Sequence, residues 1–217
     1  MAQISISGDT SGTVTLAAPS VSGTSVLTLP VATDTLVGKA TTDTLTNKTL
    51  GTGLVMGASA ITSGTAVAST SGTSIDFTGI PSWVKRITVM FAGVSTSGTS
   101  NKQIQLGTGS TTYTTTGYVG ATGYATTAAG PLSVTTGFGL ANGGTAADTN
   151  SGLIVIANIT GNNWVCSGTT STNNSSQPGL IYTNGQISLG AVLTAVRITT
   201  VNGTDTFDAG SINILYE

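Results

Sequence analysis

Residues 86–91 have the sequence Arg-Ile-Thr-Val-Met-Phe, in which the apolar Ile87, Val89 and Phe91 stand at every second position. Successive side chains of a β-strand point to opposite faces, so this spacing predicts a strand with one buried face. The same spacing recurs along the chain, and no window shows the spacing of an amphipathic helix. The sequence therefore predicts an all-β protein. The other alternating pairs are Ile4 and Ile6, Val14 and Leu16, Ile104 and Leu106, and Ile212 and Ile214.

One apolar run is continuous, Leu153-Ile-Val-Ile-Ala157, and it predicts a strand covered on both faces. The only cysteine, Cys166, is predicted to be a small buried residue on a strand. Dipeptides typical of turns separate the predicted strands. These dipeptides are Gly161-Asn162, Pro178-Gly179, Asn184-Gly185 and Asn202-Gly203.

The distribution of aromatic residues divides the chain, because none occurs between Ala2 and Gly57. We predict an N-terminal attachment and short shaft region at 1–57, a linker at 58–73 and an antiparallel, jelly-roll-like β-sandwich at 74–217. A segment as short as the first buries too little surface to be stable alone. Its Leu and Val side chains are therefore expected to pack against identical chains in a closed oligomer.

The tripeptide Ser-Gly-Thr occurs six times, and two copies begin the similar stretches 11–16 and 22–29. Each copy is typical of a turn followed by a short alternating strand. Two arrangements fit this pattern: a plain β-meander, or a repeat that stacks on or wraps around identical chains.

The composition excludes several classes of function. Charged residues make up 6% of the chain, against roughly 25% in an average protein. Four Lys and two Arg are too few to neutralise a phosphate backbone, so we expect no nucleic-acid partner. The absence of His excludes Ser-His-Asp and Cys-His catalysis. The one Glu is Glu217, and we expect no enzymatic activity, catalytic residues, cofactor or metal centre.

Two carboxylates, Asp205 and Asp208, could hold a calcium ion, although they lack the spacing of an EF-hand loop. The alternative is that both serve a turn, and the sequence leaves the question open. Met1 is followed by neither the basic nor the apolar region of a signal peptide, and no apolar run is long enough to span a membrane. We therefore expect synthesis in a cytoplasm and no membrane insertion.

Three tyrosines, Tyr113, Tyr118 and Tyr124, lie in a Gly/Thr-rich region. Exposed Tyr rings stack on sugars and contribute to protein contacts, so these three are the candidate surface or ligand contacts. The alternative is that the rings pack against the sheet or a neighbouring chain.

Two groups of motifs resemble proteins of tailed bacteriophages. The sequence Thr42-Asp-Thr-Leu-Thr-Asn-Lys-Thr-Leu50 resembles a linker of phage tail fibres and other appendages, and residues 9–19 and 25–30 resemble N-terminal segments of such proteins. Residues 75–91 and 206–216 resemble the start and end of a β-domain of phage virion proteins.

The resemblance implies a homotrimer with an N-terminal attachment region, a distal β-sandwich and no catalytic residues. The first hypothesis is a non-enzymatic virion protein assembled in the host cytoplasm: a short tail fibre, a head fibre or a capsid decoration protein. Its partners would be copies of itself, capsid or tail proteins and, in host attachment, a surface glycan. The second hypothesis is a carbohydrate- or receptor-binding module. A depolymerase tailspike is disfavoured by the single Glu and the short chain.

Overall fold

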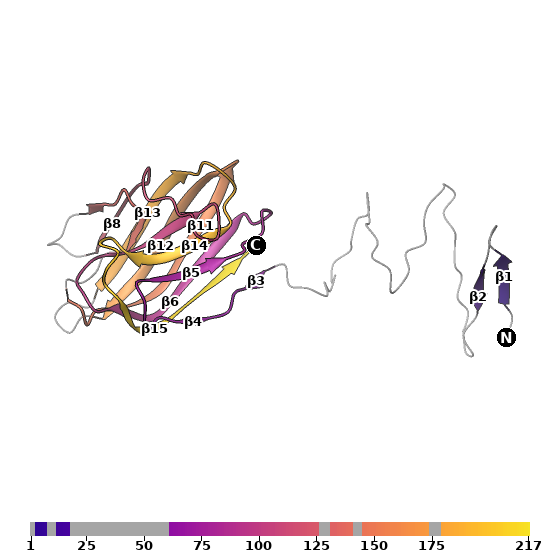
Figure 1. Ribbon diagram of the computed structural model, residues 1–217, viewed down its shortest axis with the longest axis horizontal. Helices are drawn as coiled ribbons and strands as arrows, with labels where there is room; N and C mark the ends of the chain where they lie inside the picture. The colour runs from indigo at the N-terminus through magenta and orange to yellow at the C-terminus, as the bar shows by residue number, and fades with distance from the viewer. Residues whose placement is uncertain (1–2, 8–11, 18–60, 126–130, 141–144, 174–178) are drawn as a thin grey trace. The chain divides into compact units, whose positions relative to one another are not determined.

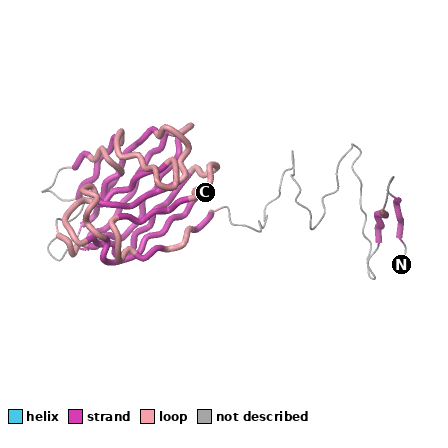
Figure 2. The backbone as a smooth tube through the Cα atoms, viewed as in Figure 1, coloured by secondary structure: helices cyan, strands magenta, loops and turns pink. Residues whose placement is uncertain are grey.

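The computed structural model describes residues 3–7, 12–17, 61–125, 131–140, 145–173 and 179–217. Within these residues every regular element is a β-strand and none is a helix (Figure 2). Every strand pair is antiparallel. The prediction of an all-β chain with an antiparallel sandwich is confirmed.

The N-terminal compact unit, Met1–Leu54, contains one described strand pair. β1 (Gln3–Ser7) pairs with β2 (Thr13–Ala17), so both alternating segments predicted here are strands. The predicted shaft and the second Ser-Gly-Thr strand at 22–29 lie outside the described residues.

The second compact unit, Val55–Glu217, includes the segment 58–73 that was predicted to be a linker. Within that segment, β3 (Thr62–Ser63) and β4 (Val67–Ala68) both pair with the C-terminal strand β15 (Phe207–Tyr216). The sheet therefore extends upstream of residue 74, and this part of the segment is held by backbone hydrogen bonds.

The second unit is a sandwich of two sheets (Figure 1). The smaller sheet has the strand order β10-β7-β14-β5, and the larger has the order β3-β15-β6-β11-β12-β13-β8-β9, with β4 also on β15. The strands not yet given are β5 (Ser74–Thr78), β6 (Arg86–Thr96), β7 (Lys102–Gly107), β8 (Val119–Tyr124), β9 (Leu132–Ser133), β10 (Phe138–Leu140), β11 (Thr149–Thr160), β12 (Asn163–Asn173), β13 (Gly179–Ser188) and β14 (Ala195–Thr200).

Apolar side chains from both sheets meet in one core between the layers. Ile104 of β7 and Val196 of β14 come from the smaller sheet, and Val89 of β6 and Ile154 of β11 come from the larger one. Burying each such side chain stabilises the fold by roughly 2 kcal/mol. Cys166 on β12 belongs to the same core, as predicted.

Within one chain, residues 153–157 are covered on one face only and not on both faces as predicted. Ile154 and Ile156 are buried in the core, but Leu153 on the opposite face is 49% exposed. Strand β7 differs from its prediction in the opposite direction. Its alternating sequence predicted one solvent-exposed face, but all six of its residues are buried. Thr136 covers its outer face: the Gln105 Nε2 donates to the Thr136 carbonyl at 3.0 Å, and the Thr136 hydroxyl donates to Gln103 Oε1 at 2.7 Å.

Two of the predicted turns are confirmed: Gly161-Asn162 joins β11 to β12, and Asn202-Gly203 lies between β14 and β15. The prediction for Asn184-Gly185 is wrong, because this pair lies within β13. A Cβ on Gly185 would stand 3.1 Å from both Gly120 and the Phe138 ring. Here the missing side chain allows close packing between the layers rather than a turn. Pro178 lies outside the described residues.

Candidate functional site

Tyr113 lies beside the smaller sheet, and its ring is already in contact with a cation. The Arg197 guanidinium lies 3.9 Å from the ring centroid, within the range of a cation–π interaction. Asp76 holds that guanidinium with two hydrogen bonds, of 2.8 Å from Nε and 2.7 Å from Nη2. Burial raises the pKa of Tyr113, and the negative charge of Asp76 raises it further. One face of this candidate contact residue is therefore occupied within the chain.

Tyr118 is a core residue, which corrects its assignment as a surface contact. Its side chain is 2% exposed, and its ring packs edge-on against Phe138 with the ring centroids 5.0 Å apart. The Leu106 backbone N–H donates to the Tyr118 hydroxyl oxygen at 2.7 Å. Burial raises the pKa of this hydroxyl. Alternation would place residue 118 on either face of a strand, so the sequence alone does not distinguish the two.

Tyr124 is half-buried and lines a shallow pocket of about 190 Å³ with Tyr182, Pro131 and Asn184. Its hydroxyl is buried and has no hydrogen-bond partner among the described residues. Burial, followed by the charge of Asp148, raises the pKa of Tyr124 to about 12. The three tyrosines therefore occupy three different environments and do not form one stacking surface.

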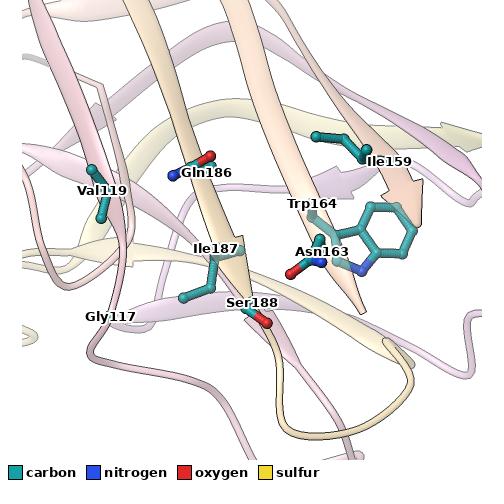
Figure 3. A pocket seen from close by; sticks show the side chains of 8 residues that line it. All are labelled: Gly117, Val119, Ile159, Asn163, Trp164, Gln186, Ile187 and Ser188. Carbon is teal, nitrogen blue, oxygen red and sulfur yellow. The ribbon is translucent and has the colours of Figure 1, made fainter. Parts of the chain in front are cut away.

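A larger pocket of about 420 Å³ lies where β8, β11, β12 and β13 end or begin (Figure 3). Its exposed apolar residues are Val119 and Ile159, and Asn163 and Gln186 contribute amide groups. The buried Trp164 indole N–H has no hydrogen-bond acceptor among the described residues. A pocket of this kind, with apolar walls and a few polar groups, can hold a small polar ligand.

The most unusual polar site is inside the sandwich. Lys102 on β7 and Asn150 on β11 are both 0% exposed, and the Lys102 Nζ donates a hydrogen bond of 2.8 Å to the Asn150 Oδ1. Lysine is almost never fully buried unless it is paired. Since β7 and β11 belong to different sheets, this hydrogen bond crosses the sandwich.

A buried carboxylate accompanies the pair. Asp148 is 1% exposed and accepts hydrogen bonds from the Thr145 N–H at 3.1 Å and the Thr145 hydroxyl at 2.6 Å. Burial lowers the pKa of Lys102 to about 8, and the charges of Asp148, Asp208 and Asp205 oppose part of that shift.

The two carboxylates considered for calcium both accept hydrogen bonds from groups within the chain. Asp205 accepts from the Asn202 Nδ2 at 2.6 Å and from the Ser100 N–H at 3.0 Å, and Asp208 accepts from the Ser95 hydroxyl. In the described part of the chain, no group of three or more His, Cys, Asp or Glu is placed to bind a metal ion. The contacts of Asp205 support the turn interpretation, whereas Asp208 lies on β15 and bonds to Ser95 of the neighbouring strand β6.

Lys102, Asn150 and Asp148 are not among the candidate residues predicted from the sequence. A signal was present for Lys102, because it stands at the same spacing as Ile104 and Leu106 and therefore on the core face of its strand. The position of Asn150 opposite Lys102 depends on how two sheets stack, which no local pattern contains.

Comparison with protein-family models, with curated proteins and with solved structures gives no match for this chain. Among the residues that the structure describes, no helix is long and apolar enough to cross a membrane.

Proposed function

We propose that this chain is a non-enzymatic structural protein of a bacteriophage particle, a short trimeric fibre or a surface-decorating appendage. The N-terminal unit would attach it to the capsid or tail, and the sandwich would project. The observation that carries the proposal is the position of the motif Thr42–Leu50, which resembles a phage appendage linker. The motif ends just before the boundary between the two compact units at Leu54 and Val55, where such an arrangement needs a linker.

An apolar patch on the outer face of the larger sheet supports the self-association. Leu153, Thr169 and Tyr182 lie opposite one another across β11, β12 and β13. Leu153 is 49% exposed, Tyr182 46% and Leu180 on β13 48%. We call Leu153, Leu180 and Tyr182 the outer apolar patch. Exposed apolar side chains grouped on one sheet face can mark a protein contact, and copies of the same chain are the proposed occupant of this patch.

The assembly is tested by light scattering on the full chain. A mass of about three times 21.4 kDa is expected. The variant Leu180→Ser should lower the trimer fraction, whereas Val201→Ser, which removes an aliphatic side chain that is 45% exposed in a loop, should not. A stable wild-type monomer would contradict the trimer.

The attachment role is tested in particles. Removing residues 1–50 from the gene in a phage that encodes the chain should leave a folded protein that no longer joins particles. The measurement is the copy number per purified particle by quantitative mass spectrometry. Incorporation of the shortened chain at normal levels would rule out the N-terminal anchor.

The second candidate function, a carbohydrate- or receptor-binding module, is favoured by one observation, the pocket of Figure 3 with its unpartnered Trp164 N–H. Saturable calorimetric binding of host surface polysaccharide by the full chain, lost in Gln186→Ala and kept in Asn184→Ala, would make ligand binding the main function. If the titration shows no heat of binding, the structural role remains the proposed function.

A further inference from the structure

The Lys102 amine and the Asn150 amide are close enough to react with little movement. Their Nζ to Oδ1 distance is 2.8 Å. A carbonyl bond is about 1.2 Å long, so Nζ lies within about 4.0 Å of Cγ whatever the angle between them. Reacting atoms in a near-attack arrangement are about 3–3.5 Å apart, so a shift of less than about 1 Å brings the amine to the amide carbon.

The surroundings favour the reactive form of the amine. An ammonium group has no lone pair and cannot attack a carbonyl carbon. With the pKa of Lys102 lowered to about 8 by burial, roughly one tenth of the amine is neutral at pH 7. Asp148, the carboxylate whose charge acts most strongly on Lys102, is buried and held by Thr145, which makes it a fixed proton acceptor.

We propose that Lys102 and Asn150 become joined by an intramolecular isopeptide bond between Nζ and Cγ, with the release of ammonia. The proposal rests on the burial of both groups, their contact across the two sheets and the buried Asp148, whose charge acts on Lys102. It does not depend on the proposed role in a phage particle.

The reaction balances without an oxidant or a co-reactant. The Lys102 ammonium passes a proton to the Asp148 carboxylate, and the neutral Nζ attacks Cγ of Asn150. The electrons of the carbonyl bond move to Oδ1. Asp148 then gives its proton to Nδ2 and takes the proton that the attacking nitrogen sheds. The Cγ–Nδ2 bond breaks as the carbonyl reforms, and the ammonia and the remaining proton leave as ammonium. One C–N bond has formed and one has broken.

The interior position explains why the reaction would be selective. Another Lys–Asn pair, Lys85 and Asn158, has its Nζ 3.3 Å from Oδ1 on the exposed surface. Water solvates both the amine and the amide at the surface, so contact alone is not enough. Lys85 and Asn158 therefore provide a matched control within the same chain.

The test is the intact mass of the full purified chain, measured after denaturation. The bond lowers the mass by about 17 Da, the mass of one ammonia. Protease digestion should release a branched peptide in which Lys102 is linked to Asn150. Lys102→Met and Asn150→Ala should each have the mass calculated from the sequence. Asp148→Asn should lose the ~17 Da more slowly or not at all. The control Lys85→Met should still show the full decrease of about 17 Da.

Succinimide at an Asn-Gly pair also removes ammonia, and the chain has such pairs at Asn142, Asn184 and Asn202. A succinimide would still form in Lys102→Met and would hydrolyse in mild base. The isopeptide bond would be absent from Lys102→Met and would be stable in mild base. Folding of each variant is checked by tryptophan fluorescence. A folded wild-type chain with its full sequence mass would overturn the proposal, and so would a mass loss that survives in folded Lys102→Met.

Discussion

Replacing Lys102 by methionine should change the denatured state as well as the folded one. Methionine has a similar length and no charge, so it fills the same space between the sheets. A cross-link between positions 48 apart restricts the unfolded chain. The chain-entropy relation gives about 14 cal/mol/K for a loop of that size, which is about 4 kcal/mol at 25 °C. The substitution should therefore lower the free energy of unfolding by about 4 kcal/mol through the lost cross-link.

If the two side chains were not linked, the substitution would instead remove the hydrogen bond from the Lys102 amine to Asn150. The Asn150 Oδ1 loses a buried donor, which costs roughly 1–3 kcal/mol. A lower stability alone therefore does not reveal the cross-link. The cross-link is revealed by the slope of the free energy of unfolding against denaturant concentration, because this slope increases with the surface exposed on unfolding. A cross-linked chain exposes less surface when it unfolds, so the wild-type slope should be smaller than that of Lys102→Met.

The assay is guanidinium chloride denaturation followed by tryptophan fluorescence, with Lys85→Met as the control. We expect a loss of roughly 4 kcal/mol and a steeper slope for Lys102→Met, and neither change for the control. Equal slopes for wild type and Lys102→Met, with a loss of no more than about 3 kcal/mol, would show that only a hydrogen bond had been removed.

Three other substitutions or reactions test the packing. Tyr118→Phe should lower the free energy of urea unfolding by about 1–3 kcal/mol, because the buried Leu106 N–H loses its acceptor. Gly210 has a φ of +92°, and a Cβ there would overlap the Gly93 backbone, so Gly210→Ala should lower the free energy of unfolding by roughly 3 kcal/mol or more. Gly203 has a φ of +69° but lies in open space, so Gly203→Ala should lower it by about 1 kcal/mol. Burial raises the pKa of Cys166 to about 12, so iodoacetamide at pH 8.5 should alkylate the thiol only in denaturant, as measured by mass spectrometry. Rapid alkylation in buffer would contradict the burial of Cys166.

The strands could be predicted from the sequence because their signal is local. The alternation at 87–91, 104–106 and 212–214 marks β6, β7 and β15, because each strand turns one face to a common core. The extent of burial is not local. Gln103 and Gln105 lie under Thr136, while Leu153 has no cover from the described part of the chain. Which face receives a second layer depends on chain segments far away in the sequence.

The same distinction explains the candidate sites. Asn184-Gly185 has the composition of a turn, but the glycine is needed where two strands and the Phe138 ring pack closely. Tyr118 and Tyr124 are six positions apart on or near one strand, yet one ring is in the core and the other lines a pocket. Exposure at these positions is decided by sheet stacking, so composition could nominate the tyrosines but not rank them.

The distribution of charge bears on why a lysine lies in the core. Burying an ammonium beside an amide lowers stability relative to an apolar pair of the same shape, unless the group gains something there. This chain has six basic residues in all and one cysteine, so it has no route to an intrachain disulfide. An amide link between β7 and β11 would remove the buried charge and hold the two sheets together by a covalent bond that does not depend on redox conditions. The energetic cost of the buried ammonium would then apply only to the chain before the bond forms.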